Sequence, residues 1–164
     1  DIVDYLLYVD KKTGLPNREK LNIYIGEMAG KVLPEAFTCF TLSLDNLSEL
    51  TKRFGYTVGD GVLKDFAGLV QLMGDTEGMR GYNGIGRFVV FFEECSSKKA
   101  AAMIRILDNQ VEEYNSLNPE YPIRYTATWA TTEETDTYEI RELLRLSQKK
   151  WKQMEKAKEQ SSCN

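Results

Sequence analysis

The pentapeptide Gly84-Ile85-Gly86-Arg87-Phe88 is the segment of this chain whose residue types most directly suggest a chemical role. Glycines spaced in this way let backbone N–H groups approach an anion, and the neighbouring Arg87 guanidinium could bind a phosphate. Tight hairpin turns require the same glycines without any ligand. Because Gly-x-Gly is a short pattern, it indicates either a phosphate-binding loop or an ordinary turn.

Several kinds of chemistry are excluded by what the chain lacks. It has no histidine, so Ser-His and Cys-His nucleophile pairs and histidine zinc sites are impossible. The cysteines Cys39, Cys95 and Cys163 match no metal-ligand spacing and are expected to be reduced thiols. Any chemistry must therefore use carboxylates, Lys, Arg, Tyr or the backbone.

Length and composition indicate one soluble domain. The chain has 164 residues, of which 42% are hydrophobic and 28% are charged, and it has no apolar run long enough to span a membrane. A net charge of -4 and a pI near 5.1 argue against nucleic-acid binding. Because the chain starts at Asp1 without Met, we expect a cytoplasmic piece of a larger protein, which could itself be membrane-attached.

The elements that would position such residues follow from apolar periodicity. Four segments carry apolar residues at helical spacing, and a short fifth helix at Leu47–Phe54 should stop at Gly55. The four predicted faces are Leu21, Tyr24, Ile25, Met28 and Val32; Val58, Val62, Phe66, Leu69 and Met73; Ala100, Ile104, Leu107, Val111 and Tyr114; and Ile140, Leu143, Ser147, Trp151 and Met154. Strands are predicted at 37–44, 80–83, 88–92 and 124–132. This order predicts an α+β domain whose helices cover a sheet.

Three ordered blocks of the sequence resemble the GGDEF family of diguanylate cyclases. DKKTGLPNR at 10–18 is similar to the family's D-x-L-T-G-L-P-N-R, and RFGYTVGDGVL at 53–63 is similar to its y-G-H-x-x-G-D-x-v-L. FVVFFEE at 88–94 resembles the strand after the acidic signature, whose place the glycine pentapeptide takes. The resemblance implies a nucleotidyl-cyclase-like fold with a mainly antiparallel sheet of about five strands. It also implies a domain at 10–160, preceded by the end of a linker helix at 1–9 and followed by a linker at 161–164. Residues 1–8 could equally be an ordinary packing helix.

The acids that the resemblance implies for metal binding are missing. Making cyclic di-GMP from two GTP molecules needs a divalent metal, and Mg²⁺ prefers carboxylate oxygens. The three implied positions hold Ser43, Gly86 and Arg87, and only the neighbouring Asp45 remains acidic. These replacements move the local formal charge from about -3 to +1, and each unit near 4 Å is worth roughly 4 kcal/mol. We expect no Mg²⁺ and no other cofactor to bind.

The positions implied for substrate contacts are also altered. The guanine-reading Asn falls at Thr51 and a phosphate-contacting Lys falls at Ser48. Asp60 matches the residue that would contact guanine, although an Asp near a helix start also caps free N–H groups. In the C-terminal helix, one register places Glu155 at a triphosphate-binding lysine and another places Lys158 there. The charges from Lys149 to Lys158 would otherwise form a solvated helix face.

Two further features of the family pattern concern feedback and the entry turn. The product-inhibition pattern R-x-x-D would fall at Asp75 and Gly78, so that site is absent, and the nearby Arg80 has the wrong spacing. Asp10 and Arg18 bracket a Gly-Pro turn and could contact each other, or could simply serve turn geometry.

The resulting hypothesis is a non-catalytic GGDEF-like regulatory domain in bacterial cyclic di-GMP signalling. It would act by relay or dimerisation with neighbouring sensor or phosphodiesterase domains. One alternative is a metal-independent nucleotide sensor, with Asp60, Gly84, Gly86 and Arg87 as candidate binding residues. Another is an active cyclase with a relocated metal site.

Overall fold

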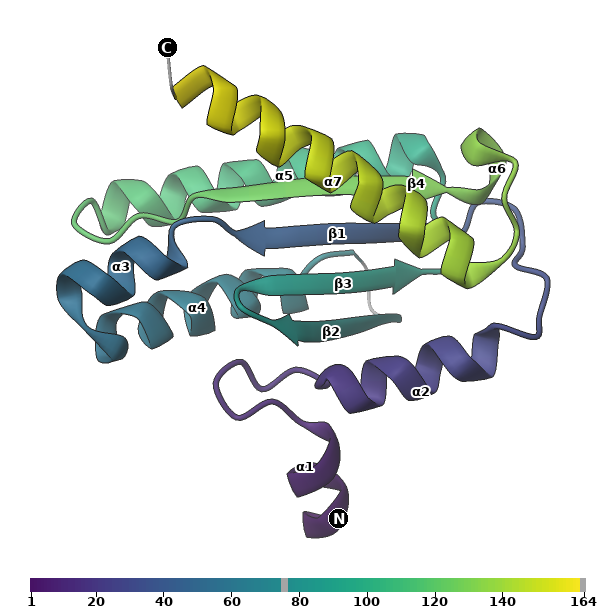
Figure 1. Cartoon of the computed structure of the whole chain (residues 1–164), viewed down its shortest axis with the longest axis horizontal. Helices are drawn as coiled ribbons and strands as arrows, with labels where there is room; N and C mark the ends of the chain where they lie inside the picture. The colour runs from purple at the N-terminus through teal and green to yellow at the C-terminus, as the bar shows by residue number, and fades with distance from the viewer. Residues whose placement is uncertain (75–76, 163–164) are drawn as a thin grey trace.

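The computed structural model describes residues 1–74 and 77–162, and these form a sheet with helices on both faces (Figure 1). The strands are β1 (Thr38–Leu44), β2 (Gly78–Gly84), β3 (Arg87–Phe92) and β4 (Tyr125–Thr131). They are paired antiparallel in the order β2-β3-β1-β4. The predicted α+β class and antiparallel sheet are confirmed, with four strands in the described residues where about five were expected.

The helices occur in the predicted order along the chain, except that the short α6 was not predicted. They are α1 (Ile2–Tyr8), α2 (Arg18–Met28), α3 (Leu47–Phe54), α4 (Tyr56–Gln71), α5 (Ser97–Leu117), the short α6 (Thr132–Thr135) and α7 (Ile140–Ser162). Helices α2 and α7 lie on one face of the sheet, and α4 and α5 lie on the other (Figure 1). None of these described helices is long and apolar enough to cross a membrane.

Local chemistry sets several of the helix ends. The Asn17 side chain accepts a hydrogen bond from Lys20 N at 3.0 Å and so caps α2, as Ser96 does for α5. Gly55 has φ 94°, which lets one residue end α3 and begin α4. The predicted stop at Gly55 is therefore confirmed.

Two apolar layers fill the space on either side of the sheet. The larger layer joins it to α4 and α5 through residues such as Phe66, and the smaller joins it to α2 and α7 through residues such as Leu143. Two residues predicted to lie on buried helix faces are exposed. Val32 is 85% exposed because α2 ends at Met28, and Met154 is 44% exposed on the second half of α7.

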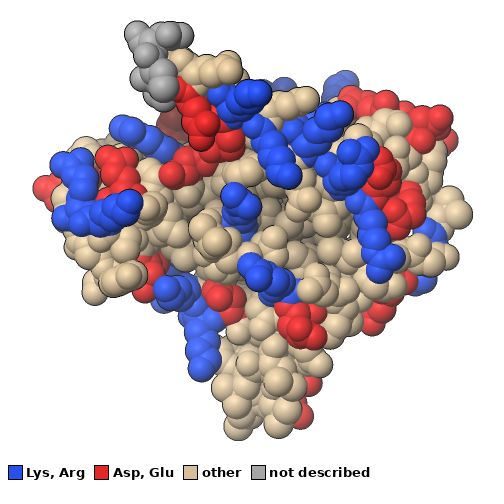
Figure 2. All heavy atoms as spheres, in the orientation of Figure 1, with Lys and Arg blue, Asp and Glu red and all other residues tan. Residues whose placement is uncertain are grey.

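The two ends of the described chain are helical. Residues 2–8 form the helix α1, and its apolar side chains are exposed to solvent. The region it occupies is mostly uncharged in Figure 2. That α1 is the end of a linker helix stays a prediction. Helix α7 runs to Ser162, so the first two residues of the linker predicted at 161–164 are helical, and the linker itself stays a prediction. Cys163 lies outside the described residues, whereas Cys39 and Cys95 are buried free thiols as predicted.

Candidate functional site

The register of the sheet brings Ser43, Gly86 and Arg87 together at one end of β1 and β3. Ser43 is the direct cross-strand partner of Arg87. The next residue, Leu44, donates its N–H to the Gly86 carbonyl at 2.7 Å. The three positions that the family resemblance assigns to metal-binding acids are thus neighbours in space.

Ser43 is buried and fully engaged by side chains of the domain itself. Only 4% of its surface is exposed. Its hydroxyl donates to Asp45 Oδ1 at 2.6 Å and accepts from the Trp151 indole Nε1 at 2.8 Å. Trp151 lies on α7, so this helix reaches across to the end of β1.

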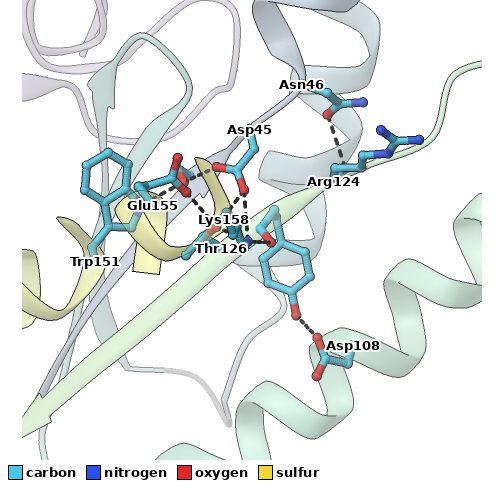
Figure 3. Close-up of polar contacts among 10 residues, drawn as sticks. Asp45, Asn46, Asp108, Arg124, Thr126, Trp151, Glu155 and Lys158 are labelled. Carbon is cyan, nitrogen blue, oxygen red and sulfur yellow. Dashed lines mark hydrogen bonds and ion pairs between the residues drawn. The ribbon is translucent and has the colours of Figure 1, made fainter. Parts of the chain in front are cut away.

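Asp45, the remaining acid, is held by polar groups from β4 and α7 (Figure 3). Its Oδ2 lies 2.6 Å from the Thr126 hydroxyl and 3.3 Å from the Lys158 ammonium. Lys158 also donates to Thr126 and to the Tyr125 carbonyl. The Lys158 ammonium therefore neutralises the one carboxylate left at this end of β1.

Glu155 belongs to the same cluster. The two residues that the alternative registers of the C-terminal helix place at the triphosphate-binding position, Glu155 and Lys158, therefore lie close together. The Glu155 Oε1 lies 2.8 Å from Thr126 Oγ1. Partial burial, together with the nearby Asp45 charge, raises the pKa of Glu155. The predicted solvated face is confirmed by the exposure of Lys150 and Lys158. Both lysines nevertheless also bond to the domain, and the Lys150 ammonium donates to the Trp129 carbonyl at 2.8 Å.

Arg87 stacks on an indole ring of the domain. Its guanidinium carbon lies 4.6 Å from the centre of the Trp151 ring, which is a cation–π geometry. The sequence placed Trp151 on an apolar helix face and missed this role. The only sequence signal for this role was helical spacing, which places Ser147, Trp151, Glu155 and Lys158 on one side of the helix.

The glycine loop is explained by turn geometry. Gly84, Ile85 and Gly86 all have positive φ angles, and Ile85 is 85% exposed at the tip. The Gly86 N–H donates inward to the Tyr82 hydroxyl at 2.8 Å, so it is not directed at a ligand. The prediction that the Gly86 N–H helps to bind a phosphate is therefore wrong, and the ordinary-turn alternative accounts for both glycines.

The residues at the predicted guanine-binding positions have partners within the domain. Thr51 donates its hydroxyl to the Leu47 carbonyl at 2.9 Å, as a threonine within a helix often does. Asp60 forms an ion pair with Lys12 at 3.3 Å. Helix α4 begins at Tyr56 with Gly55 as its N-cap residue, so Asp60 lies in the second turn and the capping prediction is wrong. Ser48 is exposed in the first turn of α3.

Arg80, near the expected feedback site, has a structural role. It is 6% exposed and its guanidinium donates to the carbonyls of Val70 and Met73 at the end of α4. It also lies 4.9 Å from the centre of the Phe92 ring, and burial lowers its pKa. Gly78 is in β2, while Asp75 lies outside the described residues.

The entry turn uses Asp10 and Arg18 separately. Asp10 accepts hydrogen bonds from the Thr13 N–H and hydroxyl, both at 2.8 Å, which supports the turn-geometry alternative for this residue. Arg18 donates to the Asn83 carbonyl at 2.6 Å and so ties the start of α2 to the hairpin. The Asp10–Arg18 contact that the sequence suggested is replaced by these two.

The charges around Asp45 do not suit a divalent metal or a triphosphate. A hollow of about 340 Å³ beside it is lined by Asp45, Asn46, Glu49, Arg124, Glu155, Lys158 and Glu159. The hollow has more carboxylates than cations, which disfavours binding of a triphosphate. The Asp45 carboxylate, which could bind a metal ion, is already paired with Lys158. Within residues 1–74 and 77–162, no group of three or more His, Cys, Asp or Glu is arranged to hold a metal ion. Ser43, Gly86 and Arg87 supply no carboxylate to this end of the sheet, whereas carboxylate oxygens are typical protein ligands of Mg²⁺.

Comparison with known proteins identifies the family. The family model described as diguanylate cyclase, GGDEF domain, matches residues 7–162. This chain belongs to the GGDEF family. A comparison with curated proteins gave no match.

Solved structures share the fold of this GGDEF domain. The FimX GGDEF domain from Pseudomonas aeruginosa has a TM-score of 0.71 at 18% identity, over 87% of this chain and 90% of that one. A diguanylate cyclase/phosphodiesterase from Caldicellulosiruptor saccharolyticus has a TM-score of 0.67 at 19% identity, over 87% and 83%. LapD S helix-GGDEF-EAL from Vibrio cholerae, bound to c-di-GMP, has a TM-score of 0.65 at 14% identity, over 79% and 30%. The chain thus spans less than a third of that LapD structure.

Proposed function

We propose that this GGDEF domain is non-catalytic and acts in bacterial cyclic di-GMP signalling through relay to, or dimerisation with, neighbouring domains. The observation that carries the proposal is the pairing of Ser43 with Arg87 across β1 and β3. At this place the family's chemistry requires carboxylates around a metal, and here a buried hydroxyl faces a cation. An arginine repels the metal that the reaction needs.

The surroundings of these two residues support the same conclusion. Asp45 bonds to Ser43 and pairs with Lys158, so its charge is compensated without a metal. Thr51 and Asp60, at the positions of base recognition, bond to Leu47 and Lys12. Restoring catalysis would require changes at several of these places together.

The link to signalling partners comes from the structural relatives. The LapD structure contains an S helix, a GGDEF domain and an EAL domain, and it is bound to c-di-GMP. The chain studied has a helix at each end, α1 and α7, through which neighbouring domains could be connected. A change in packing worth about 1–3 kcal/mol would be enough to alter a neighbour's output several-fold.

The proposal is tested by incubating the purified chain with GTP and either Mg²⁺ or Mn²⁺, beside an active GGDEF domain as a positive control. We expect no cyclic di-GMP by chromatography from this chain. Product that increases with protein concentration and disappears in an Asp45→Asn variant would overturn the proposal.

Relay is tested in the full-length protein. Deleting residues 10–160 should change a neighbouring domain's activity or its response to a signal. An Arg87→Ala variant should have little effect on that activity unless a nucleotide binds at Arg87, so it distinguishes relay from ligand sensing. Calorimetric titration with GTP, ATP and cyclic di-GMP, with and without Mg²⁺, measures whether the wild type and the Arg87→Ala variant bind a nucleotide. Binding that Arg87→Ala abolishes would favour the nucleotide sensor instead.

A further inference from the structure

The second half of α7 has no fully buried apolar side chain to hold it against the sheet. In the first half, Ile140, Leu143 and Ser147 are fully buried. From Lys149 to residue 161, only Trp151 and Glu155 are partly buried, and all other side chains are exposed. Apolar burial therefore holds the helix only as far as its middle.

A gap between the sheet and the second half of α7 confirms that the packing is incomplete there. The hollow has a volume of about 450 Å³ and opens between this half and β4. Its lining residues are Ala127, Thr128, Trp129, Lys150, Gln153, Met154 and Ala157. Side chains that face such a space lack contact partners on one side and gain little dispersion energy from docking.

Polar contacts supply the remaining attachment, some to β4 and some to the altered catalytic positions. The Trp151 ring lies under the Arg87 guanidinium while its indole N–H donates to Ser43. About two helical turns further along α7, Lys158 binds Asp45. We call these five residues the latch. Two of them, Ser43 and Arg87, stand where the resemblance places acids.

We propose that the latch holds the second half of α7 against the sheet, and that this half-helix opens and closes as a local unit whose closed state depends on Arg87. An acid at position 87 would remove the cation that faces the indole ring. Segments with few buried apolar contacts open at lower free energy than the rest of a domain. The inference goes beyond the proposed function, because it concerns the isolated domain and holds whether or not the domain relays a signal.

Hydrogen exchange measured by mass spectrometry on the 164-residue chain, without nucleotide, tests the latch. Arg87→Ala should speed amide exchange in 151–162 by about threefold to tenfold, the range expected for losing one cation–π contact. Exchange in α5 and β1 should not change. Arg145→Ala is the matched control, because Arg145 pairs with Glu142 on the exposed side of α7. Equal exchange in the two variants would overturn the proposal.

A second readout follows Trp151 itself. The chain has two tryptophans, so a Trp129→Phe background leaves Trp151 as the only indole reporter. In that background, Arg87→Ala should make the fluorescence more accessible to acrylamide, and Arg87→Lys should have an intermediate effect. If Arg87→Ala perturbs the whole fold, Lys158→Ala tests the latch from its other end, with faster exchange confined to the residues after Trp151. Unchanged exchange and quenching in Lys158→Ala as well would refute the latch.

Discussion

The first half of α7 is attached to the sheet by buried side chains, whereas the second half is attached by polar contacts. Ile140 and Leu143 are fully buried against the sheet, and Ser147 bonds to the Thr41 hydroxyl at 2.8 Å. Beyond them, attachment depends on Trp151 and Lys158. One continuous helix is thus held by two kinds of interaction.

The two kinds of interaction differ in magnitude. Burying a leucine side chain contributes about 1.5–3 kcal/mol, while a partly exposed ion pair contributes about 0–1 kcal/mol. The first half should therefore open only when the domain unfolds, and the second half should open locally. If the second half opens locally, as proposed, changes there would move the end of the helix without unfolding the core.

Leu143→Ala should have the largest effect. Leu143 is fully buried, and truncating a buried leucine costs about 2–5 kcal/mol through lost burial and the cavity left behind. Urea denaturation should show a large fall in the unfolding midpoint. Met154→Ala is the matched change on the second half, where the side chain is 44% exposed, and should cost less than about 1 kcal/mol. Comparable losses in the two variants would contradict the division of the helix.

The sequence was informative where local chemistry decides the structure. The α3 helix at Leu47–Phe54 was predicted with its end, because only a glycine readily adopts the backbone angle found at Gly55. Periodicity also located the face of α7 that carries Ile140 and Leu143. It failed for Val32, because apolar spacing continues past the point where α2 ends at Met28.

The candidate site was predictable only in part, because its contacts join distant segments. Resemblance to the family identified Ser43, Gly86 and Arg87, and the sheet register brings them together. Helical spacing places Trp151 on one side of α7 with Ser147 and Lys158, but it does not show that the ring stacks on Arg87, since that contact joins α7 to the start of β3. The inward direction of the Gly86 N–H was missed for a different reason: it depends on the hydroxyl of Tyr82, four residues earlier in the same hairpin, and glycine spacing alone does not reveal that partner.

Ser147→Ala should have an intermediate effect at the boundary between the two halves. The variant removes the partner of the Thr41 hydroxyl, which is 5% exposed, and leaving a buried hydroxyl unpaired costs about 1–3 kcal/mol. Adding Thr41→Val removes that unpaired group, so the double variant should be more stable than Ser147→Ala alone. Urea denaturation of all four proteins completes a double-mutant cycle. A purely additive cycle would show that this hydrogen bond does not help to fix the first half.

Glu155→Gln should have the smallest effect on stability, and that effect should depend on pH. Burial and the nearby Asp45 raise the pKa of Glu155, so the folded protein binds its proton more tightly than the unfolded chain does. The wild type therefore loses stability as pH rises from the ordinary glutamate range through the raised pKa of the folded state. The variant cannot ionise at this position and lacks that loss.

The stability of Glu155→Gln relative to the wild type should thus increase as pH rises from the ordinary glutamate range through the raised pKa of the folded state, and then level off. The gain should stay below about 1 kcal/mol, because Glu155 is partly exposed and solvent screens its interaction with Asp45. Urea midpoints across this range measure it, with Glu112→Gln on the exposed side of α5 as the control. Since opening of the second half of α7 would also relieve Glu155, hydrogen exchange in 151–162 of the wild type should become faster over the same pH range, after correction for the intrinsic rate. A relative stability that falls with rising pH would mean that Glu155 is stabilised as a carboxylate by Lys158, and that the polar half of the helix is held more tightly at neutral pH than in acid.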